Sequence, residues 1–218
     1  MTTAPTRRRP RRHSPAEPRP HPATHGHGWG EDGPTAEELE RERLWERLVA
    51  QGWRAEIVGG RIVVSPWTRQ RQALLVDRVG DQLYAVKRER GWVFYQTWAV
   101  HIPPLRGDKR LPDLLVAPPD CPRFDDSQAY GHGTLLAVEV CSEDSRHEDH
   151  EVKPAEYARA GVPLMLVVDE FATPKTVTLF RDLRDGAYRT RIEVTEGEVL
   201  ELPEPFGVKL DTTALFAP

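Results

Sequence analysis

The chain has 218 residues, of which 39% are hydrophobic and 29% charged, so it is long enough to bury one sizeable core. Its formal net charge is −4 at pH 7, and because residues 1–33 carry six arginines against three acidic residues, the rest of the chain is more acidic still. This balance argues against a protein that holds nucleic acid mainly through its own charge, and the lack of a long apolar run argues against a membrane-spanning segment.

Residues 1–33 are rich in Pro, Arg and His and almost lack large aliphatic side chains. Such a stretch cannot bury enough surface to offset the entropy of ordering, so we predict a disordered tail, followed by a single domain over residues 34–218. The arginines of the tail are not followed by a hydrophobic stretch, so no secretory signal is expected. With two cysteines, Cys121 and Cys141, at no zinc-ribbon spacing, the chain suits a reducing compartment, and we expect a cytoplasmic protein.

The ordered part is predicted to begin with a helix, a hairpin and a second helix. The sequence TAEE at 35–38 has the pattern of a capping box at a helix start. Residues 55–66, AEIVGGRIVVSP, are typical of two strands that turn at the glycine pair. Residues 71–91 then place aliphatic residues at helical spacing and stop at a glycine.

Strand-like segments dominate the rest of the chain, with one further helix around residues 154–160. A hairpin is expected where Asp185 and Gly186 separate the last two of these segments. Mixed strands with helices on either side predict an α/β or α+β domain with a central sheet. The expected strands lie within residues 92–103, 111–118, 134–142, 164–170 and 176–194.

Several common enzyme motifs are missing from the chain. It contains no GxGxxG, GxxxxGK[ST], HExxH or GxSxG. Dinucleotide binding, phosphate-loop hydrolysis, zinc proteolysis and serine-elbow hydrolysis therefore lack their usual sequence support.

Three charged residues next to apolar segments form the candidate site. Asp113 opens one predicted strand, in LPDLLV, and Glu139 lies late in another, in LAVEV. If these strands are neighbours, both carboxylates can meet at one edge of the sheet, where hard oxygen ligands suit Mg²⁺ or Mn²⁺. Lys153 could supply the cation that phosphodiester hydrolysis needs beside a metal and an oriented water.

Pro154 predicts where the helix after these strands begins. Proline is tolerated in the first turn of a helix and costs about 3 kcal/mol in its interior, so we expect the helix to begin near Lys153. Lys153 and the positive end of the helix could then face the same anion. Tyr157, further along the helix, is expected to pack in the core.

Each of the three charged residues also has a simpler interpretation. Asp113 could be a turn residue at a strand start, Glu139 could face water on an edge strand, and Lys153 could be an ordinary surface lysine. The three residues together favour a site more strongly than any one of them does alone.

Two other groupings of polar residues are weaker candidates. Cys141, His147 and His150 lack a fourth zinc ligand at an expected spacing. Ser142 lies too close in sequence to His147 and Asp149 for a nucleophilic triad, so it is expected to be a cap or turn residue.

The segment from LPDLLVAP to LMLVVDE resembles the Uma family of restriction endonucleases, long catalogued as a domain of unknown function in the PD-(D/E)XK nuclease superfamily. The motifs that carry the resemblance are a PD at a strand start, an EV-x-S strand end, a D-x-x-x-K pair, and Y-A-x-A-G-V-P before an apolar strand. The similarity runs from about Trp53 to the closing FGVKLDTTALF. It implies a restriction-endonuclease-like central mixed sheet flanked by helices.

The resemblance implies a role for each residue that matches the pattern. Asp113 and Glu139 would be metal ligands, and Lys153 would be the catalytic lysine. Asp149, four positions before that lysine, would orient the lysine or a metal-bound water. Glu56, ahead of the first hairpin turn, would complete the metal shell.

Two positions depart from the family pattern. The superfamily motif has a lysine two residues after the glutamate, where this chain has Cys141, so the lysine of the following helix must serve instead. A histidine common at the start of the helix after the first hairpin is replaced by Arg71, which weakens any role built on that position.

We therefore expect an Mg²⁺- or Mn²⁺-dependent endonuclease, a hydrolase that cuts phosphodiester bonds, with DNA favoured over RNA as the substrate. A homodimer is plausible because paired cuts need two sites, and no membrane partner is expected. The alternative is a non-catalytic module of the same fold that acts through nucleic acid or a protein partner.

Overall fold

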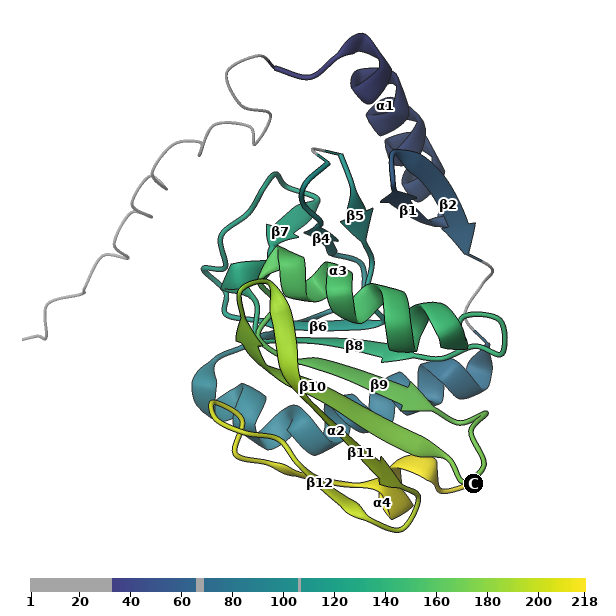
Figure 1. The fold of residues 1–218 in the computed structure, drawn as a ribbon, viewed down its shortest axis with the longest axis vertical. Coiled ribbons are helices and arrows are strands. Elements are labelled where there is room, and N and C mark those ends of the chain that lie inside the picture. The colour runs from purple at the N-terminus through teal and green to yellow at the C-terminus, as the bar shows by residue number, and fades with distance from the viewer. Residues whose placement is uncertain (1–32, 66–68, 106) are drawn as a thin grey trace, which may run out of the picture.

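A computed structural model describes residues 33–65, 69–105 and 107–218 of the chain (Figure 1). The predicted tail over residues 1–33 lies outside these residues except for Gly33, so its disorder stays a prediction. In the part of the chain that the structure describes, no helix is both long and apolar enough to cross a lipid bilayer.

The first elements form as their local sequence predicts. Helix α1 (Ala36–Ala50) begins at a capping box, in which the Glu38 amide donates to the Thr35 hydroxyl at 3.2 Å and the Thr35 amide donates to the Glu38 carboxylate at 2.7 Å. Strands β1 (Arg54–Val58) and β2 (Arg61–Ser65) are joined by a turn at two glycines with φ of 57° and 72°. Residues that carry a side chain rarely adopt these φ values. Helix α2 (Gln70–Arg90) ends at a left-handed glycine, as expected.

Two large mixed sheets form the body of the protein. The six-stranded sheet has the order β11-β10-β9-β8-β6-β3, and the five-stranded sheet has the order β2-β1-β5-β4-β7. In the larger sheet β8 and β9 are parallel and the other neighbours are antiparallel. The bounds are β3 (Val93–Tyr95), β4 (Ala99–His101), β5 (Lys109–Arg110), β6 (Leu114–Ala117), β7 (Gln128–Tyr130), β8 (Leu136–Val140), β9 (Met165–Asp169), β10 (Thr176–Arg184) and β11 (Ala187–Thr195).

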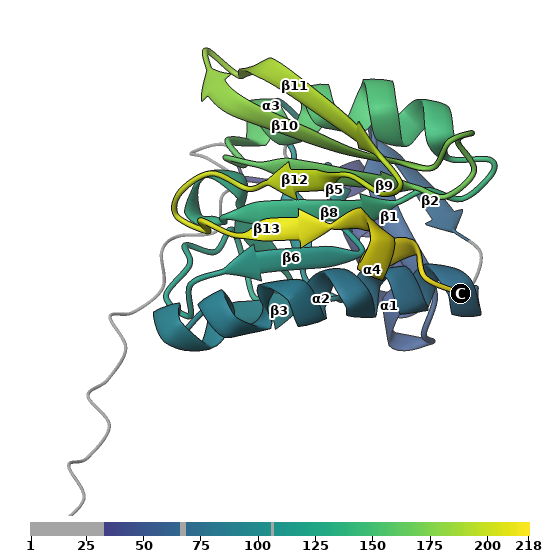
Figure 2. The ribbon, with the colours of Figure 1, turned by 90° about the horizontal axis from the view of Figure 1, so that it is seen from below.

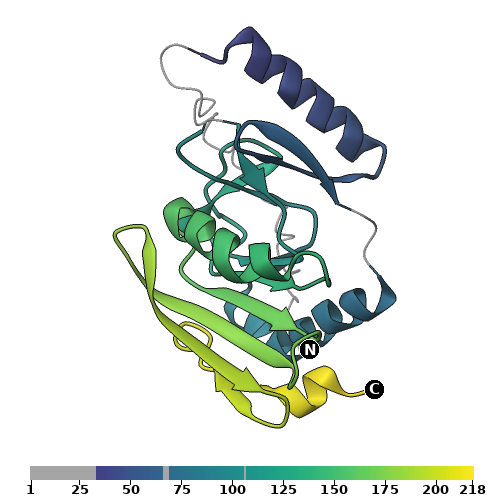
Figure 3. The same ribbon diagram turned by 45° about the vertical axis from the view of Figure 1, so that its right-hand side comes forward.

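The larger sheet is covered on both faces, by α2 on one side and by α3 (Lys153–Ala160) on the other (Figure 2). Alternate residues of β6 serve the two faces, because Leu114 and Val116 pack in the α2 core while Leu115 and Ala117 pack in the α3 core. Figure 3 shows α3 lying between the β1–β2 hairpin and the β10–β11 hairpin. The predicted central mixed sheet flanked by helices is confirmed.

One predicted strand is wrong. Residues 92–103 were expected to form a single strand, but they form β3 and β4, which belong to different sheets. A bend at residues 96–97 carries the chain from one sheet to the other, and the rings of Tyr95 and Trp98 meet across it with centroids 4.7 Å apart. An apolar run does not reveal such a bend, because both halves are strand-like.

The end of the chain closes over the α2 side of the larger sheet. Strands β12 (Val199–Glu201) and β13 (Lys209–Asp211) pair, and α4 (Thr212–Phe216) follows them, with leucines and phenylalanines of these segments in the α2 core. The hairpin predicted at Asp185 and Gly186 is confirmed, and both residues have positive φ, at 49° and 68°. Short 3₁₀ and π turns, η1 (Gly131–Gly133) and η2 (Glu148–Val152), complete the described elements.

Candidate active site

Asp113 and Glu139 are brought together by the pairing of β6 and β8. These strands are antiparallel neighbours in which Leu114 lies opposite Val138, so the same register continues to place Asp113 opposite Glu139. The Val140 amide donates to Asp113 Oδ2 at 2.7 Å, which fixes the aspartate against β8. The strand pairing therefore places the two residues opposite each other, where β6 begins and β8 ends.

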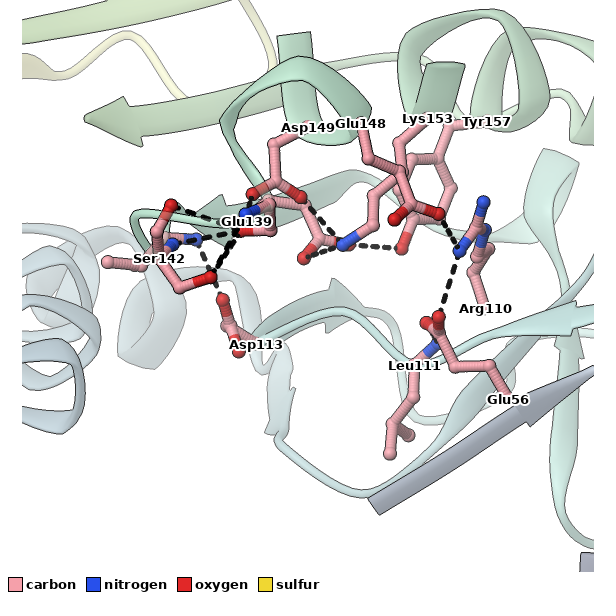
Figure 4. A network of polar contacts seen from close by, with 12 residues as sticks. Glu56, Arg110, Leu111, Asp113, Glu139, Ser142, Glu148, Asp149, Lys153 and Tyr157 are labelled. Atoms are coloured by element: carbon pink, nitrogen blue, oxygen red, sulfur yellow. Dashed lines mark hydrogen bonds and ion pairs between the residues drawn. The ribbon is translucent and has the colours of Figure 1, made fainter. Parts of the chain in front are cut away.

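Lys153 neutralises the buried glutamate (Figure 4). Its Nζ lies 2.8 Å from Glu139 Oε2 and 2.7 Å from Asp149 Oδ1. The Tyr157 hydroxyl donates to the other oxygen, Glu139 Oε1, at 2.6 Å. Glu139 is only 2% exposed, so without these partners its charge would be costly to bury. Tyr157, expected only to pack, is thus also a polar member of the site, four residues after Lys153 on the same helix face.

The α-helix that carries Lys153 begins at that residue, as Pro154 predicts, but helical turns continue ahead of it. The π turn η2 runs directly into α3, and the Lys153 amide donates to the Glu148 carbonyl five residues back. Pro154 has no N–H and its ring crowds the carbonyl four residues before it, and the wider turn ahead of it relieves that conflict. The prediction that Lys153 stands at the positive end of a helix is therefore wrong. The turn instead directs Asp149 and Lys153 toward each other.

Glu56 lies near this group but is held by a different cation. Its Oε2 accepts from Arg110 Nη1 at 2.9 Å, and its Oε1 accepts from the Leu111 amide at 2.7 Å. Arg110 is 1% exposed and also pairs with Glu148 at 2.7 Å and Glu156 at 2.6 Å (Figure 4). Arg110 therefore ties strand β1 to the helix that carries Lys153, and both oxygens of Glu56 already have partners.

Arg54 is a member of the site that the sequence reasoning missed. Its Nη2 lies 2.9 Å from Asp113 Oδ1 and donates to the Leu111 carbonyl at 2.5 Å. Burial works against the charge, but Asp113, Glu139 and Glu56 together raise the pKa of Arg54. Arg54 and Glu56 are two apart on β1 and so point to the same side, a spacing that could have drawn attention to it.

The acidic residues of the site strongly perturb one another. Burial raises the pKa of Glu139 to about 8, and Asp113 and Asp149 add to the rise while Lys153 opposes it. Burial also raises the pKa of Asp113, against the opposing effect of Arg54. Burial alone would lower the pKa of Lys153, yet Glu139 and its neighbouring acids hold it above the usual range. Burial is thus the main cause of the raised carboxyl pKa values. The ion pairs show a surplus of negative charge as well, because six carboxylates contact only three cations, Arg54, Arg110 and Lys153.

This surplus of negative charge fits a divalent cation. Asp113 and Glu139, opposite each other across β6 and β8, offer hard carboxylate oxygens, the donor type that Mg²⁺ and Mn²⁺ prefer. A divalent cation there would offset the cost of burial that raises the pKa of each carboxyl. Cys141, next to Val140 at the end of β8, cannot supply that charge, because a thiol is never cationic. Burial and the nearby Asp149 raise the pKa of this thiol, which keeps it neutral.

Ser142, a member of one of the two weaker groupings, has a structural role. Ser142 lies in a turn, as predicted, where its hydroxyl accepts from the Ser145 amide at 3.1 Å. The Ser145 hydroxyl donates to Asp149 Oδ2 at 2.6 Å and so helps to orient that carboxylate.

A second cluster of potential metal ligands lies beside the site. Cys141 and His150 meet Asp169 rather than His147, with ligand atoms all within 4.8 Å of one another. These donors suit a softer ion such as Zn²⁺. Asp169 is already engaged, however, by Arg146 at 2.8 Å and by His150 at 3.2 Å, so hydrogen bonding alone accounts for its position.

The protein has a mixed α+β fold, with mixed sheets flanked by helices. It is similar to a crystal structure from Anabaena variabilis described as "a putative nuclease belonging to DUF820", with a TM-score of 0.57 and 15% sequence identity over 75% of this chain and 89% of that one. No curated protein matches the chain. Residues 37–213 match the Uma2 family, described as "Putative restriction endonuclease", and the chain belongs to that family.

Proposed function

We propose that the protein is a metal-dependent endonuclease that hydrolyses phosphodiester bonds, in DNA rather than RNA. The observation that carries the proposal is that Asp113 lies opposite Glu139 across β6 and β8, and that Lys153 contacts both Glu139 and Asp149. Membership of the Uma2 family supports a nuclease. The expected ion is Mg²⁺ or Mn²⁺, held by Asp113 and Glu139, with Glu56 as a third ligand if Arg110 releases it.

The residues of the site divide the work of hydrolysis. The chemistry that Mg²⁺ or Mn²⁺ supplies when bound is Lewis-acid stabilisation of the charge that develops on the phosphate. Lys153 orients the attacking water and stabilises the added charge as the new P–O bond forms and the bond to the leaving oxygen breaks. Asp149 keeps Lys153 charged and aimed, since the two atoms lie 2.7 Å apart.

We further propose that the protein is cytoplasmic and forms a homodimer. Both cysteines are free thiols and buried, which suits a reducing cytoplasm. A homodimer would let two sites cut both strands of a duplex, and light scattering of the purified protein tests it.

The alternative is a module that binds nucleic acid or a protein without cutting. The cysteine in place of the strand lysine and the acidic balance of the chain favour this reading. Such a module could still bind a metal through Asp113 and Glu139 without hydrolysing the nucleic acid.

Cleavage assays distinguish the two functions. Supercoiled plasmid, single-stranded DNA and RNA are incubated with Mg²⁺, Mn²⁺ or EDTA, using the wild type, Asp113→Asn and Glu139→Gln. Asp81→Asn is the matched control because Asp81 is exposed on α2, a helix that covers the opposite face of the sheet. Nicking that needs metal, survives in Asp81→Asn and disappears in both site variants supports the nuclease. No cutting of any substrate favours the module. Cutting that persists in EDTA or in both site variants comes from contamination or another site and refutes the assignment.

A further inference from the structure

Arg54 differs from the other cations of the site in its access to solvent. Its side chain is 25% exposed, whereas that of Lys153 is 11% exposed and that of Arg110 is 2% exposed. Lys153 and Arg110 are each enclosed by acidic partners, so Arg54 is the cation best placed to meet a molecule arriving from solution.

The contacts of Arg54 also leave much of its guanidinium available. Among the described residues, its ion pair with Asp113 and its hydrogen bond to the Leu111 carbonyl both use Nη2. Nη1 and Nε make no hydrogen bond or ion pair there and can donate elsewhere. A guanidinium with adjacent free donors matches the oxygens of a phosphate group, which it can bind in a two-pronged manner.

A metal ion would also compete with Arg54 for the Asp113 carboxylate. It is paired with Asp113, one of the two carboxylates that we assign to metal binding, and it lies in the field of Glu139 and Glu56 as well. A divalent cation at Asp113 would repel the guanidinium and weaken that ion pair. Arg54 would then need a new anionic partner close by.

We propose that Arg54 has two successive partners: Asp113 when no metal is bound, and a phosphate of the nucleic-acid substrate once a divalent cation takes its place. This inference rests on the proposed function. In the metal-free protein Arg54 lowers the cost of the buried aspartate, and in the loaded protein it supplies binding to the backbone of the substrate. A protein of acidic balance thereby gains a phosphate contact where the reaction takes place.

The proposal predicts opposite effects of one substitution on two kinds of binding. Removing Arg54 removes the competitor for Asp113, so Arg54→Gln should bind Mn²⁺ about fivefold or more tightly than the wild type, as measured by titration calorimetry. The same variant should bind a labelled DNA duplex roughly tenfold more weakly in Ca²⁺, as measured by fluorescence anisotropy. A residue that only supports the fold would weaken both.

Two further variants control for charge and for folding. Arg61→Gln removes an exposed positive charge from the other strand of the hairpin and should change Mn²⁺ affinity by less than about twofold. Arg54→Lys keeps a charge beside Asp113 but loses the two-pronged donor, so it should keep the Mn²⁺ affinity of the wild type and still bind DNA more weakly. Arg54→Lys also provides the test if Arg54→Gln does not fold.

The outcomes separate this inference from the function on which it rests. If the wild type binds Mn²⁺ and cuts, but Arg54→Gln binds Mn²⁺ no more tightly, the two-partner role is overturned and the nuclease stands. Unchanged DNA binding in Arg54→Lys and Arg54→Gln would overturn it too. If the wild type binds no Mn²⁺ and cuts nothing, both the nuclease and the inference fail.

Discussion

Lys153 should be essential for stability as well as for the proposed chemistry. Its side chain is 11% exposed and is shared by Glu139 and Asp149, whose side chains are each 2% exposed. Replacing Lys153 with Met keeps much of the volume but leaves two buried carboxylates facing each other without a cation. Breaking a buried ion pair in this way costs about 3–5 kcal/mol.

The loss should be easy to measure. For a chain of this size each kcal/mol corresponds to about 2–4 °C in Tm, so Lys153→Met should melt roughly 6–20 °C below the wild type. Urea unfolding followed by circular dichroism gives the free energy of unfolding directly. The matched control is Lys209→Met, which breaks the exposed pair with Glu201, where both side chains are 73% exposed, and should cost about 0–1 kcal/mol.

A second substitution shows whether the unpaired charge is the cause. Adding Glu139→Gln to Lys153→Met removes one of the two stranded carboxylates and should restore part of the lost stability. A Lys153→Met variant as stable as Lys209→Met would refute the reasoning, because the site would then tolerate its acids without the lysine. Cleavage assays on Lys153 variants are interpretable only beside such stability data.

Three further outcomes are expected. Millimolar Mn²⁺ should raise the Tm of the wild type, reversibly with EDTA, and leave Asp113→Asn unmoved in thermal-shift measurements; an equal shift in both would place the ion elsewhere. Burial and the nearby Lys109 lower the pKa of His101 below its usual 6.5, so the unfolded chain takes up the proton first and stability should fall as pH drops below about 6.5. His101→Phe, which keeps the stack on Phe124 at 4.2 Å, should flatten urea-derived stability against pH in that range, and an unchanged slope would exclude His101 as the source. Gly131→Ala should destabilise the protein by about 1–3 kcal/mol, because a Cβ there would lie 2.4 Å from the Ala160 carbonyl oxygen. The control is Gly80→Ala in α2, whose Cβ would meet nothing nearer than Phe94 at 3.6 Å. It should be neutral or stabilising by up to about 1 kcal/mol in the same urea measurements.

The elements that could be predicted from the sequence are those whose cause is local. The capping box of α1, the glycine turn between β1 and β2 and the turn at Asp185 each depend on residues within four positions of one another. The pairing of Asp113 with Glu139 could be anticipated because each marks a strand end and the family pattern joins them. It still required β6 and β8 to be neighbours, which local pattern does not specify.

Two features of the site could not be predicted from the sequence. The partners of the arginines lie far away in the chain, and the proline is compatible with two different local structures. Arg54 meets Asp113 across 59 positions of the chain, and Arg110 meets Glu56 across 54, and nothing near either arginine indicates its partner. Pro154 signals an irregularity in the helix, but a helix start and a π turn both satisfy a missing N–H. The contacts that accompany the π turn, those of Lys153 and Tyr157 with Glu139 on β8, are not indicated by the residues around the proline.

The π turn makes the site tolerant of a change in chain length. Its bonds span five residues instead of four, so Glu148–Val152 holds one residue more than a regular helix would need for the same advance. Deleting one residue between Asp149 and Lys153 would leave a regular helix, so the chain before it would keep its course and the acid would stand three positions before the lysine instead of four. Residues three apart and residues four apart both lie on one face of a helix, so the two side chains would remain neighbours. Relatives that differ by a single residue in this segment would therefore retain the ion pair at a different spacing in the sequence.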